Sequence, residues 1–352
     1  MPTVVQFTAP RQVELVDCAP EPLRPGTVRV ATLYSGISAG TELTAYRGSN
    51  PYLTRAWDAE ARLFRDGEPT APYPLVGWGY SEVGRVVEVA DDVTSPAVGD
   101  VVHGIWGHRS EAVLPADALA WRRLPEGTDP VVGVFARVGS IALNAVLAAD
   151  VRLGEQVAVF GQGVIGLLAT RLAALSGARV VAVDVQPGRL EVATRLGAAA
   201  VVPALVDGGV GAVVRDVTGG GADSAIELSG SSAALHEAVR SVVVEGTVVA
   251  SGFYQGGAEA LRLGEEFHHN RVSIVASQIS GVPVPVGRRW DQPRLVRVFM
   301  DQVLTGAVDV APLVTDVVAA ADVATAFDRL DAGDPDLLQA VLKFDTDAGE
   351  RA

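Results

Sequence analysis

The segment FGQGVIG, residues 160–166, constrains this 352-residue chain more than any other feature of its sequence. It follows the apolar run QVAVF and leads into VIGLLATRLAALSG, so three glycines spaced as GxGxxG stand where a strand turns into a helix. Glycines let the backbone approach a ligand closely, and a helix N-terminus presents N–H groups to a pyrophosphate. The segment therefore predicts a dinucleotide site formed by Gly161, Gly163, Val164, Ile165 and Gly166.

Asp184 indicates which dinucleotide binds. It ends the next apolar run, RVVAVD, 18 residues after Gly166, where a carboxylate can accept hydrogen bonds from an adenosine ribose. The same carboxylate repels a 2′-phosphate, which favours NAD over NADP. Arg189 follows in DVQPGRL and keeps NADP open as the alternative, because a guanidinium can pair with that phosphate; its other interpretations are that it covers the adenine face or meets solvent.

The pattern of apolar and polar residues divides the chain into regions of different predicted secondary structure. From about residue 140 to 277, apolar strands alternate with amphipathic helices, a pattern that predicts a parallel sheet covered on both faces. The first 125 residues instead contain short β-rich runs separated by Gly, Pro and Asp. Residues 50–74 interrupt these runs with a charged, helix-like stretch, which we interpret as either a lid or a solvated surface loop. After residue 278 the pattern predicts two amphipathic helices, RLVRVFMDQVLTG and ADVATAFDRLDAG, and a last strand, QAVLKF.

Composition excludes several classes of partner. With 28 basic and 42 acidic residues the net charge is −14, which argues against binding nucleic acid or anionic membranes. No uninterrupted apolar run approaches the roughly 18 residues that span a bilayer, and the first residues lack the pattern of a signal peptide. We therefore expect a cytoplasmic protein that acts on a small molecule. The single cysteine, Cys18, excludes an internal disulfide and a multi-cysteine zinc cage.

The order of these parts resembles the medium-chain dehydrogenase/reductase superfamily, to which zinc alcohol dehydrogenases belong. The resemblance covers nearly the whole chain and depends on YSGISAGTEL (34–43), GYSEVG (79–84), AVGDVVHG (97–104), FGQGVIG and GADSAIELSG (221–230). More narrowly, SGISAGTE and YPLVGWGYSEVGRVVE are similar to the branch that contains the bacteriochlorophyllide dehydrogenases.

This resemblance implies an α/β fold with two domains. Residues 1–138 and 278–352 would form a GroES-like β-rich catalytic domain, and residues 139–277 a Rossmann domain with a doubly wound parallel sheet. The nicotinamide and the substrate would then bind in the cleft between the domains. The resemblance also implies a homodimer or homotetramer joined through Rossmann edge strands near residues 271–277.

This chain departs from the family's pattern at the positions of the zinc ligands. Where zinc-dependent relatives read GICGTD and GHExxG, this chain has Ser38 for the cysteine, and Tyr80 and Ser81 for the histidine and glutamate. Arg137 falls near the third ligand position. A neutral hydroxyl is a poor zinc ligand and a guanidinium opposes a dication, so we expect no zinc and no metal ligands. The histidines offer no convincing replacement pair; they are His103, His108, His236, His268 and His269.

Ordinary hydrogen-bond donors would have to replace the metal. We predict that Tyr80 donates to the substrate oxygen; the alternative is that its hydroxyl only ties down the turn. Ser38, Thr41 and Glu42 are candidates for relaying a proton or fixing Tyr80, with structural roles open for each. His268 and His269 are further catalytic candidates, because a pKa near neutrality suits proton transfer. The remaining cofactor contacts follow from the resemblance; they are Gly252 and Phe253 beneath the nicotinamide ring, Ser277 and Gln278 near its carboxamide, and Ser229.

Three functions remain open from the sequence. The leading prediction is a zinc-independent NAD(P)(H)-dependent oxidoreductase that interconverts a secondary alcohol and a ketone on a small polar substrate, such as a cyclic polyol, a sugar or a natural product. The second is reduction of a carbon–carbon double bond conjugated to a carbonyl, because conjugation spreads the developing charge. The third is a nucleotide-binding protein without catalysis.

Overall fold

The computed structural model describes residues 1–345, and these form two compact units. Unit one comprises Met1–Arg137 together with the chain from Val310 onward, and unit two comprises Val138–Asp309. The sequence predicted the return to unit one at residue 278, but the segment up to Asp309 belongs to unit two. The reason is the helix α8 (Gln292–Leu304), whose buried Phe299 ring occupies the space beside Gly139, where a Cβ would lie 2.1 Å from the ring.

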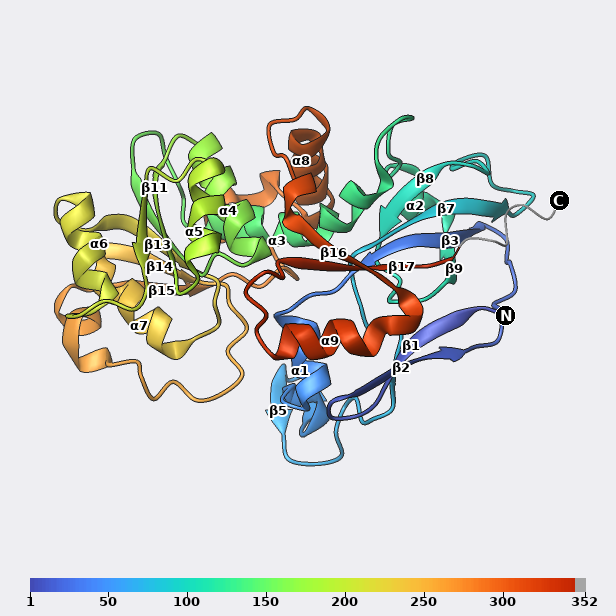
Figure 1. The fold of residues 1–352 in the computed structure, drawn as a ribbon, viewed down its shortest axis with the longest axis horizontal. Helices are drawn as coiled ribbons and strands as arrows, with labels where there is room; N and C mark the ends of the chain where they lie inside the picture. The colour runs from blue at the N-terminus through green and yellow to red at the C-terminus, as the bar shows by residue number, and fades with distance from the viewer. Residues whose placement is uncertain (346–352) are drawn as a thin grey trace. The chain divides into compact units, whose positions relative to one another are not determined.

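Unit two contains a six-stranded parallel sheet in the order β12-β11-β10-β13-β14-β15. Figure 1 labels β11, β13, β14 and β15 of this sheet. Its strands are β10 (Gln156–Phe160), β11 (Arg179–Asp184), β12 (Ala200–Pro203), β13 (Ala222–Glu227), β14 (Val242–Ala250) and β15 (Ser273–Ala276). Its helices are α3 (Phe135–Ala148, which begins in unit one), α4 (Val164–Leu175), α5 (Pro187–Arg195), α6 (Val210–Thr218), α7 (Ser232–Ser241) and α8. This is the strand order of a doubly wound dinucleotide-binding sheet, in which the connections reverse direction between β10 and β13.

The parallel arrangement decides where ligands bind. Because every strand runs the same way, the segments that follow the strands meet at one edge of the sheet, and ligands of such sheets bind at this edge, next to the reversal point. The core beneath it is apolar, with Phe160, Val181, Val214 and Val239 almost completely buried.

Unit one contains a mixed sheet in the order β16-β17-β3-β7-β8, with β9 also paired to β3, and a smaller sheet in the order β2-β1-β6. The strands are β1 (Thr3–Ala9), β2 (Gln12–Asp17), β3 (Thr27–Gly36), β6 (Leu75–Val76), β7 (Glu82–Val89), β8 (Val101–Gly104), β9 (Glu111–Pro115), β16 (Val314–Ala319) and β17 (Gln339–Lys343). Its longer helices are α1 (Thr41–Arg47), α2 (Ala116–Ala120) and α9 (Val323–Asp331). The predicted α/β fold class is therefore confirmed.

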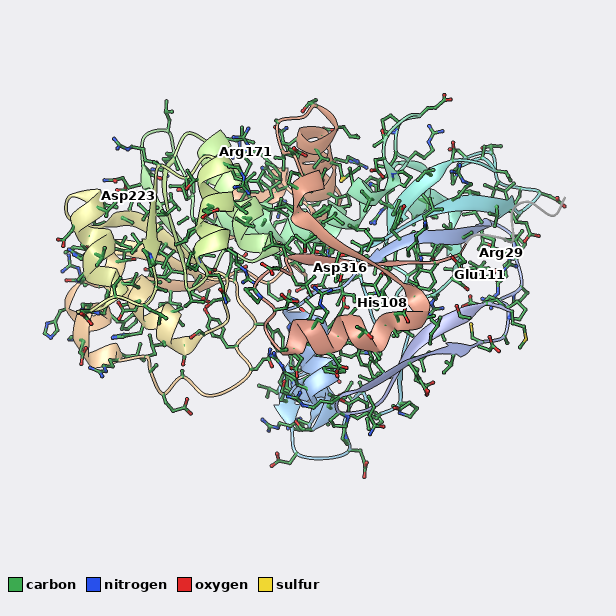
Figure 2. The ribbon with its side chains drawn as sticks, viewed as in Figure 1. Arg29, His108, Glu111, Arg171, Asp223 and Asp316 are labelled. Carbon is green, nitrogen blue, oxygen red and sulfur yellow. The ribbon has the colours of Figure 1, made fainter. Side chains whose placement is uncertain are left out.

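Two kinds of contact hold unit one together. On the surface of the mixed sheet, Arg29 on β3 pairs with Glu111 on β9 at 2.8 Å (Figure 2). It also pairs with Glu88 on β7 at 2.9 Å. In the core, the ring of Phe327 on α9 meets Phe7 edge-on at 5.1 Å and stacks on Tyr46 at 5.4 Å. The core contact ties the C-terminal return to the N-terminal strands.

The helix-like interpretation of residues 50–74 is wrong. The segment contains a 3-10 turn, Pro51–Leu53, and two short antiparallel strands, β4 (Ala56–Asp58) and β5 (Leu63–Arg65). The rings of Trp57 and Phe64 pack at 4.8 Å, and the Tyr52 ring contacts both. Aromatic pairs across adjacent strands stabilise a hairpin, and this cluster outweighs the helical propensity of the charged residues between them.

One described stretch, Pro130–Ala148, is long and apolar enough to cross a membrane by length and composition, with a hydropathy of 1.9. It consists of the 3-10 helix η2 (Pro130–Val134) and α3. In its most apolar window 72% is buried inside the fold, as in a core helix, so this finding is weak evidence for a membrane span. The absence of a membrane partner stays a prediction.

Candidate active site

The dinucleotide loop joins β10 to α4. Gly161 has a φ of +86°, and a Cβ there would lie 2.7 Å from the backbone nitrogen of Ser229. A Cβ at Gly166 would lie 1.8 Å from the carbonyl oxygen of Gly161, so only glycine lets the helix begin this close to the strand. A Cβ at Gly163 would meet nothing within 4 Å, which leaves open space at the helix N-terminus. This is the geometry that accommodates a pyrophosphate.

Gln162 fixes the shape of this loop. Its fully buried amide donates to the Val159 carbonyl oxygen at 2.8 Å and accepts the Thr170 hydroxyl at 2.9 Å. Its backbone N–H donates to Asp184 Oδ2 at 2.5 Å. The GxGxxG pattern leaves this position unspecified, so the sequence analysis did not select Gln162. Val164 and Ile165 follow as the first turn of α4.

Asp184 ends β11, as predicted, and its carboxylate is buried. Oδ1 accepts the backbone N–H of Gln186 at 2.7 Å, and Oδ2 accepts that of Gln162. A carboxylate oxygen accepts more than one hydrogen bond, so both oxygens keep capacity for ribose hydroxyls. Arg189 lies on α5, and its Nε is buried with no hydrogen-bond partner among the described residues.

Glu227, which the sequence analysis missed, organises the segments after β13 and β14. Its buried carboxylate accepts the backbone N–H groups of Ser229 at 2.7 Å and Gly230 at 3.2 Å, and the Tyr254 hydroxyl at 2.5 Å. Burial raises the pKa of this carboxyl, and the donated hydrogen bonds oppose the rise. Gly252 packs closely here, since a Cβ would lie 2.3 Å from the Gly230 nitrogen. The available signal was an acidic residue at the end of an apolar strand.

The remaining predicted cofactor residues lie at the same edge of the sheet. Phe253 follows β14, and Ser277 and Gln278 follow β15. Ser277 is buried and accepts a hydrogen bond from Asn144 at 3.0 Å, while Gln278 accepts the backbone N–H of Ser280 at 2.6 Å. The structure thus brings together the predicted cofactor residues that follow β10, β11, β13, β14 and β15.

His268 and His269 do not join them. They precede β15, at the amino end of the strand, and both are exposed, with their rings 5.4 Å apart. The amino end of a parallel strand lies at the opposite edge of the sheet from the dinucleotide loop. The sequence placed them near β15 correctly but gave no information on which end of the strand they would occupy. We therefore remove both from the candidate site.

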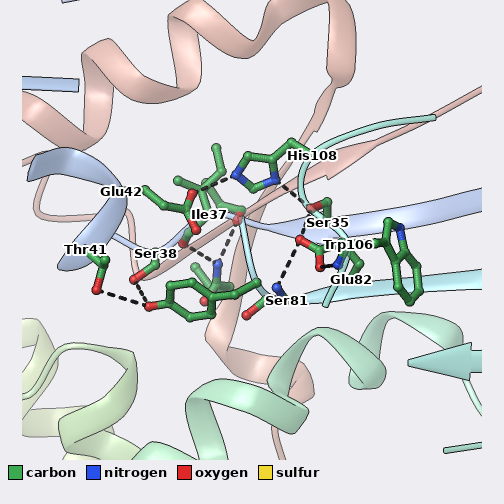
Figure 3. Close-up of polar contacts among 12 residues, drawn as sticks. Ser35, Ile37, Ser38, Thr41, Glu42, Ser81, Glu82, Trp106 and His108 are labelled. Atoms are coloured by element: carbon green, nitrogen blue, oxygen red, sulfur yellow. Dashed lines mark hydrogen bonds and ion pairs between the residues drawn. The ribbon is translucent and has the colours of Figure 1, made fainter. Parts of the chain in front are cut away.

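In unit one, Tyr80, Ser38 and Thr41 form a hydroxyl cluster. Tyr80 lies two residues before β7, Ser38 between β3 and α1, and Thr41 at the start of α1. The Tyr80 hydroxyl donates to Ser38 Oγ at 2.5 Å and lies 3.5 Å from Thr41 Oγ1 (Figure 3). Burial raises the pKa of Tyr80, and the nearby Glu42 carboxylate adds to the rise. Ser38, Thr41 and the positive charge of Arg137 oppose it.

Arg137 contributes a positive charge to this cluster. The preceding 3-10 helix packs against the turns that carry the cluster, because a Cβ at Gly36 would lie 3.3 Å from Val134 Cβ and 3.4 Å from Ser81 Cβ. Burial lowers the pKa of the Arg137 guanidinium, and the interaction with Tyr80 opposes the shift. Arg122 lies close enough for the charge of Arg137 to add to the lowering of its own pKa by burial.

The residues present do not fit a zinc ion. The positions that correspond to ligands carry Ser38, Tyr80, Ser81 and Arg137, which offer three neutral hydroxyls and a cation. Within residues 1–345, the group of three or more His, Cys, Asp or Glu side chains with ligand atoms within 4.8 Å of one another is His236, Glu265 and Glu266. That group belongs to unit two.

A buried ionisable network lies next to the hydroxyl cluster. His108 Nε2 is 2.7 Å from Glu42 Oε2, and His108 Nδ1 is 2.6 Å from Ser35 Oγ, which donates to Glu82 Oε1 at 3.1 Å (Figure 3). The sequence analysis named Glu42, but it treated His108 only as a possible metal ligand and did not select Ser35 or Glu82. The sequence spacing of residues 35, 42, 82 and 108 does not predict that their side chains contact one another.

The fold, the dinucleotide loop and the hydroxyl cluster are those of an oxidoreductase with a doubly wound nucleotide unit and a separate β-rich unit. The zinc-binding dehydrogenase family matches residues 164–290. The chain is 32% identical to a D-guloside 3-dehydrogenase of Escherichia coli over 90% of this chain and 92% of that one. It is 30% identical to (R,R)-butanediol dehydrogenase of Bacillus subtilis over 73% and 77%.

A solved structure described as a zinc-binding dehydrogenase of Sinorhizobium meliloti bound to NADP has the same fold, with a TM-score of 0.76, 21% identity, and coverage of 97% of this chain and 99% of that one. The chain therefore belongs to the medium-chain zinc-binding dehydrogenase family, whose matched relatives are alcohol and polyol dehydrogenases.

Proposed function

We propose that this member of the family is a zinc-independent, NAD-dependent dehydrogenase that interconverts a secondary alcohol and a ketone on a small, polyhydroxylated, sugar-like substrate. The observation that carries the proposal is the hydroxyl cluster of Tyr80, Ser38 and Thr41, with the charge of Arg137 acting on it, at the positions where zinc ligands are expected. The D-guloside and butanediol relatives support an alcohol with neighbouring oxygen substituents. The resemblance of SGISAGTE and YPLVGWGYSEVGRVVE to the bacteriochlorophyllide dehydrogenase branch stays a prediction, and the proposal does not extend to that substrate.

The hydroxyl cluster can serve as a proton donor to a ketone. A hydroxyl donates one proton and accepts at its oxygen, so Tyr80 can turn its proton from Ser38 to the substrate oxygen while the Ser38 hydroxyl donates to Tyr80. Negative charge that develops on that oxygen during reduction is stabilised by the Tyr80 proton and by the nearby guanidinium of Arg137. In the oxidative direction Tyr80 accepts the alcohol proton as the phenolate, which the Arg137 guanidinium stabilises.

These groups supply enough stabilisation to replace a metal. Zinc contributes several kcal/mol by polarising a carbonyl oxygen, and one preorganised donor in a water-excluded site contributes about 3 kcal/mol. Tyr80 together with the charge of Arg137 reaches that range. A raised phenol pKa keeps the Tyr80 proton in place at neutral pH.

The nucleotide site supports NAD. The open loop at Gly163 accommodates a pyrophosphate, and Asp184 accepts ribose hydroxyls and repels a 2′-phosphate. When bound, the nicotinamide donates or accepts the hydride. Arg189, with its unpartnered Nε, is the residue that would favour NADP, which the Sinorhizobium structure binds.

The test is turnover by wild type and two tyrosine variants. Under anaerobic conditions, NADH consumption is measured against a panel of ketoses and cyclic ketones and a panel of enones. We expect ketone reduction that falls about 100-fold in kcat in Tyr80→Phe, with little change in KM, because the lost donor acts in the transition state. The matched control is Tyr73→Phe, which removes a hydroxyl bonded to the Ala45 carbonyl and should leave kcat unchanged.

Other outcomes point to other functions. Consumption of NADH with enones alone would identify a double-bond reductase, and tight NADH binding without turnover would identify a nucleotide-binding protein. Unchanged turnover in Tyr80→Phe would reduce that hydroxyl to a structural role. The proposal also includes a homo-oligomer formed through β15, which lies at the edge of its sheet. It further includes a cytoplasmic location and the absence of nucleic acid partners.

A further inference from the structure

The proposed reaction does not use the buried network of His108, Glu42, Ser35 and Glu82. These four side chains are at most 1% exposed. We infer that His108 is a positioning residue for Tyr80: as a buried cation it holds the Glu42 carboxylate beside Tyr80, and that carboxylate keeps the Tyr80 hydroxyl protonated and ready to donate. The inference deepens the proposed function and depends on it for the role of Tyr80.

The hydrogen bonds indicate that both nitrogens of His108 are donors. Glu42 Oε2 is an acceptor when ionised, so Nε2 donates to it at 2.7 Å. Ser35 has one hydroxyl proton, which it donates to Glu82, so Nδ1 donates to Ser35 Oγ at 2.6 Å. An imidazole that donates from both nitrogens is an imidazolium.

The alternative is that the shared proton lies on Glu82. Two backbone N–H groups oppose it, from Ser81 at 3.1 Å and Trp106 at 2.7 Å, because each donates to the Glu82 carboxylate and favours its ionised form. Burial raises the pKa of Glu82, whereas His108 and these backbone groups lower it. Burial also lowers the pKa of His108, but the Glu42 and Glu82 carboxylates more than reverse this and place its pKa above the ordinary value.

His108 is the cation that balances this region. Its ion pair with Glu42 is completely buried. Around the ring, Glu42 faces it from α1 and Ser35 from β3, which connects it to Glu82 on β7. The turn before β7 closes the remaining side, since a Cβ at Gly79 would lie 2.9 Å from the His108 ring. Buried carboxylates need such a partner, since an unpaired buried charge is strongly unfavourable.

Glu42 connects the network to the catalytic hydroxyl. His108 holds Oε2, whereas Oε1 is buried and has no hydrogen-bond partner among the described residues. The negative charge of Glu42 contributes to the raised pKa of Tyr80, since it disfavours a neighbouring phenolate. Without the cation, Glu42 would take up a proton or turn away, and the pKa of Tyr80 would fall.

The first experiment measures the protonation state of His108 directly. In protein labelled at histidine, the ring carbon and nitrogen shifts of the five histidines are assigned by single substitutions and followed from about pH 5 to 9. We expect His108 to be an imidazolium at pH 7 and His103, the matched buried histidine, to be neutral. A neutral His108 at pH 7 overturns the inference. The same measurement in Tyr80→Phe keeps this result independent of the proposed function.

The second experiment reads the effect on Tyr80. Ketone reduction requires protonated Tyr80, so kcat falls on an alkaline limb set by the phenol pKa in the enzyme–substrate complex. In His108→Gln and in Glu42→Gln we expect this limb to move down by about one pH unit, which lowers kcat about tenfold at a fixed pH on the limb. His103→Gln should leave the limb where it is. An unmoved limb in folded Glu42→Gln overturns the inference even if His108→Gln does not fold.

A double variant separates positioning from simple structural support. His108→Gln with Glu42→Gln leaves no unpaired carboxylate at this pair, so its melting temperature should recover relative to His108→Gln. Its alkaline limb should nevertheless stay shifted, because the charge beside Tyr80 is still missing. Recovery of the limb together with the melting temperature would show that His108 acts only through stability.

Discussion

The nucleotide edge of unit two and the hydroxyl cluster of unit one work by different means. At the nucleotide edge, the loop between β10 and α4 acts through backbone N–H groups and through the missing Cβ atoms of Gly161 and Gly166. At the cluster, the proposed function depends on side-chain hydroxyls and charges contributed by segments near residues 38, 80 and 137. A site formed by backbone groups requires particular residue types at fixed spacing. A site formed by side chains can lose its metal ligands and use other residues in their place.

The glycine loop gives the largest predicted effect. Gly166→Ala places a Cβ against the backbone of Gly161, so the loop must move, and we expect dinucleotide affinity to fall at least about 100-fold with a loss of stability of about 1–3 kcal/mol. Gly163→Ala is the control, since its Cβ meets no protein atom within 4 Å. It should retain the wild-type melting temperature and lose affinity only through contact with the ligand. Calorimetric titration with NADH and thermal unfolding measure both; equal affinities in the two variants would contradict this account of the loop.

This contrast explains what the sequence revealed. The parallel sheet of unit two, the loop, the position of Asp184 and the two C-terminal helices were predictable because hydrophobic periodicity and glycine spacing are local signals. The hairpin at residues 56–65 was missed because ring contacts between strands outweighed local propensity. His108 was missed as a functional residue because its partners, Glu42 and Ser35, lie on other elements and only the tertiary fold brings them together.

Unit one also allows a comparison of two buried histidines. His103 is 4% exposed, and burial, with a smaller contribution from Arg122, lowers its pKa from 6.5 to about 3. The folded protein keeps His103 neutral while the unfolded chain takes up a proton below pH 6.5, so stability is lost as the pH falls from 6.5 toward 3. By about pH 4.5 this loss amounts to roughly 3 kcal/mol.

His103→Gln should therefore lose about 3 kcal/mol less than wild type between pH 7 and about pH 4.5, measured by urea unfolding. His108 has the opposite sign: its raised pKa gives stability that is present below the ordinary value and lost as the pH rises through the folded value. An identical acid loss in His103→Gln and wild type would show that His103 is protonated in the fold.

A smaller effect is expected at Asp184. Asp184→Asn keeps an acceptor oxygen for one of the two backbone N–H groups that donate to Asp184, and it removes the charge that repels a 2′-phosphate. We expect the preference for NADH over NADPH to fall about tenfold, which corresponds to about 1.4 kcal/mol. Arg189→Met in the same background should remove the gain for NADPH if Arg189 contacts the phosphate. Paired Kd values for both cofactors decide this, and an unchanged ratio in Asp184→Asn would place the discrimination elsewhere.

The smallest expected effect is the most direct test of the contrast between the two regions. Dialysis against a strong chelator should leave kcat and KM unchanged, because Ser38, Tyr80 and Arg137 offer no ligand set for zinc. Metal found by elemental analysis does not settle the matter alone, since His236, Glu265 and Glu266 place ligand atoms within 4.8 Å of one another in unit two. His236→Ala removes an imidazole from that group, so metal lost in this variant without loss of activity was not catalytic. Activity lost on chelation and restored by zinc, in wild type and His236→Ala alike, would instead place the electrophile on a metal and leave Tyr80 as its neighbour.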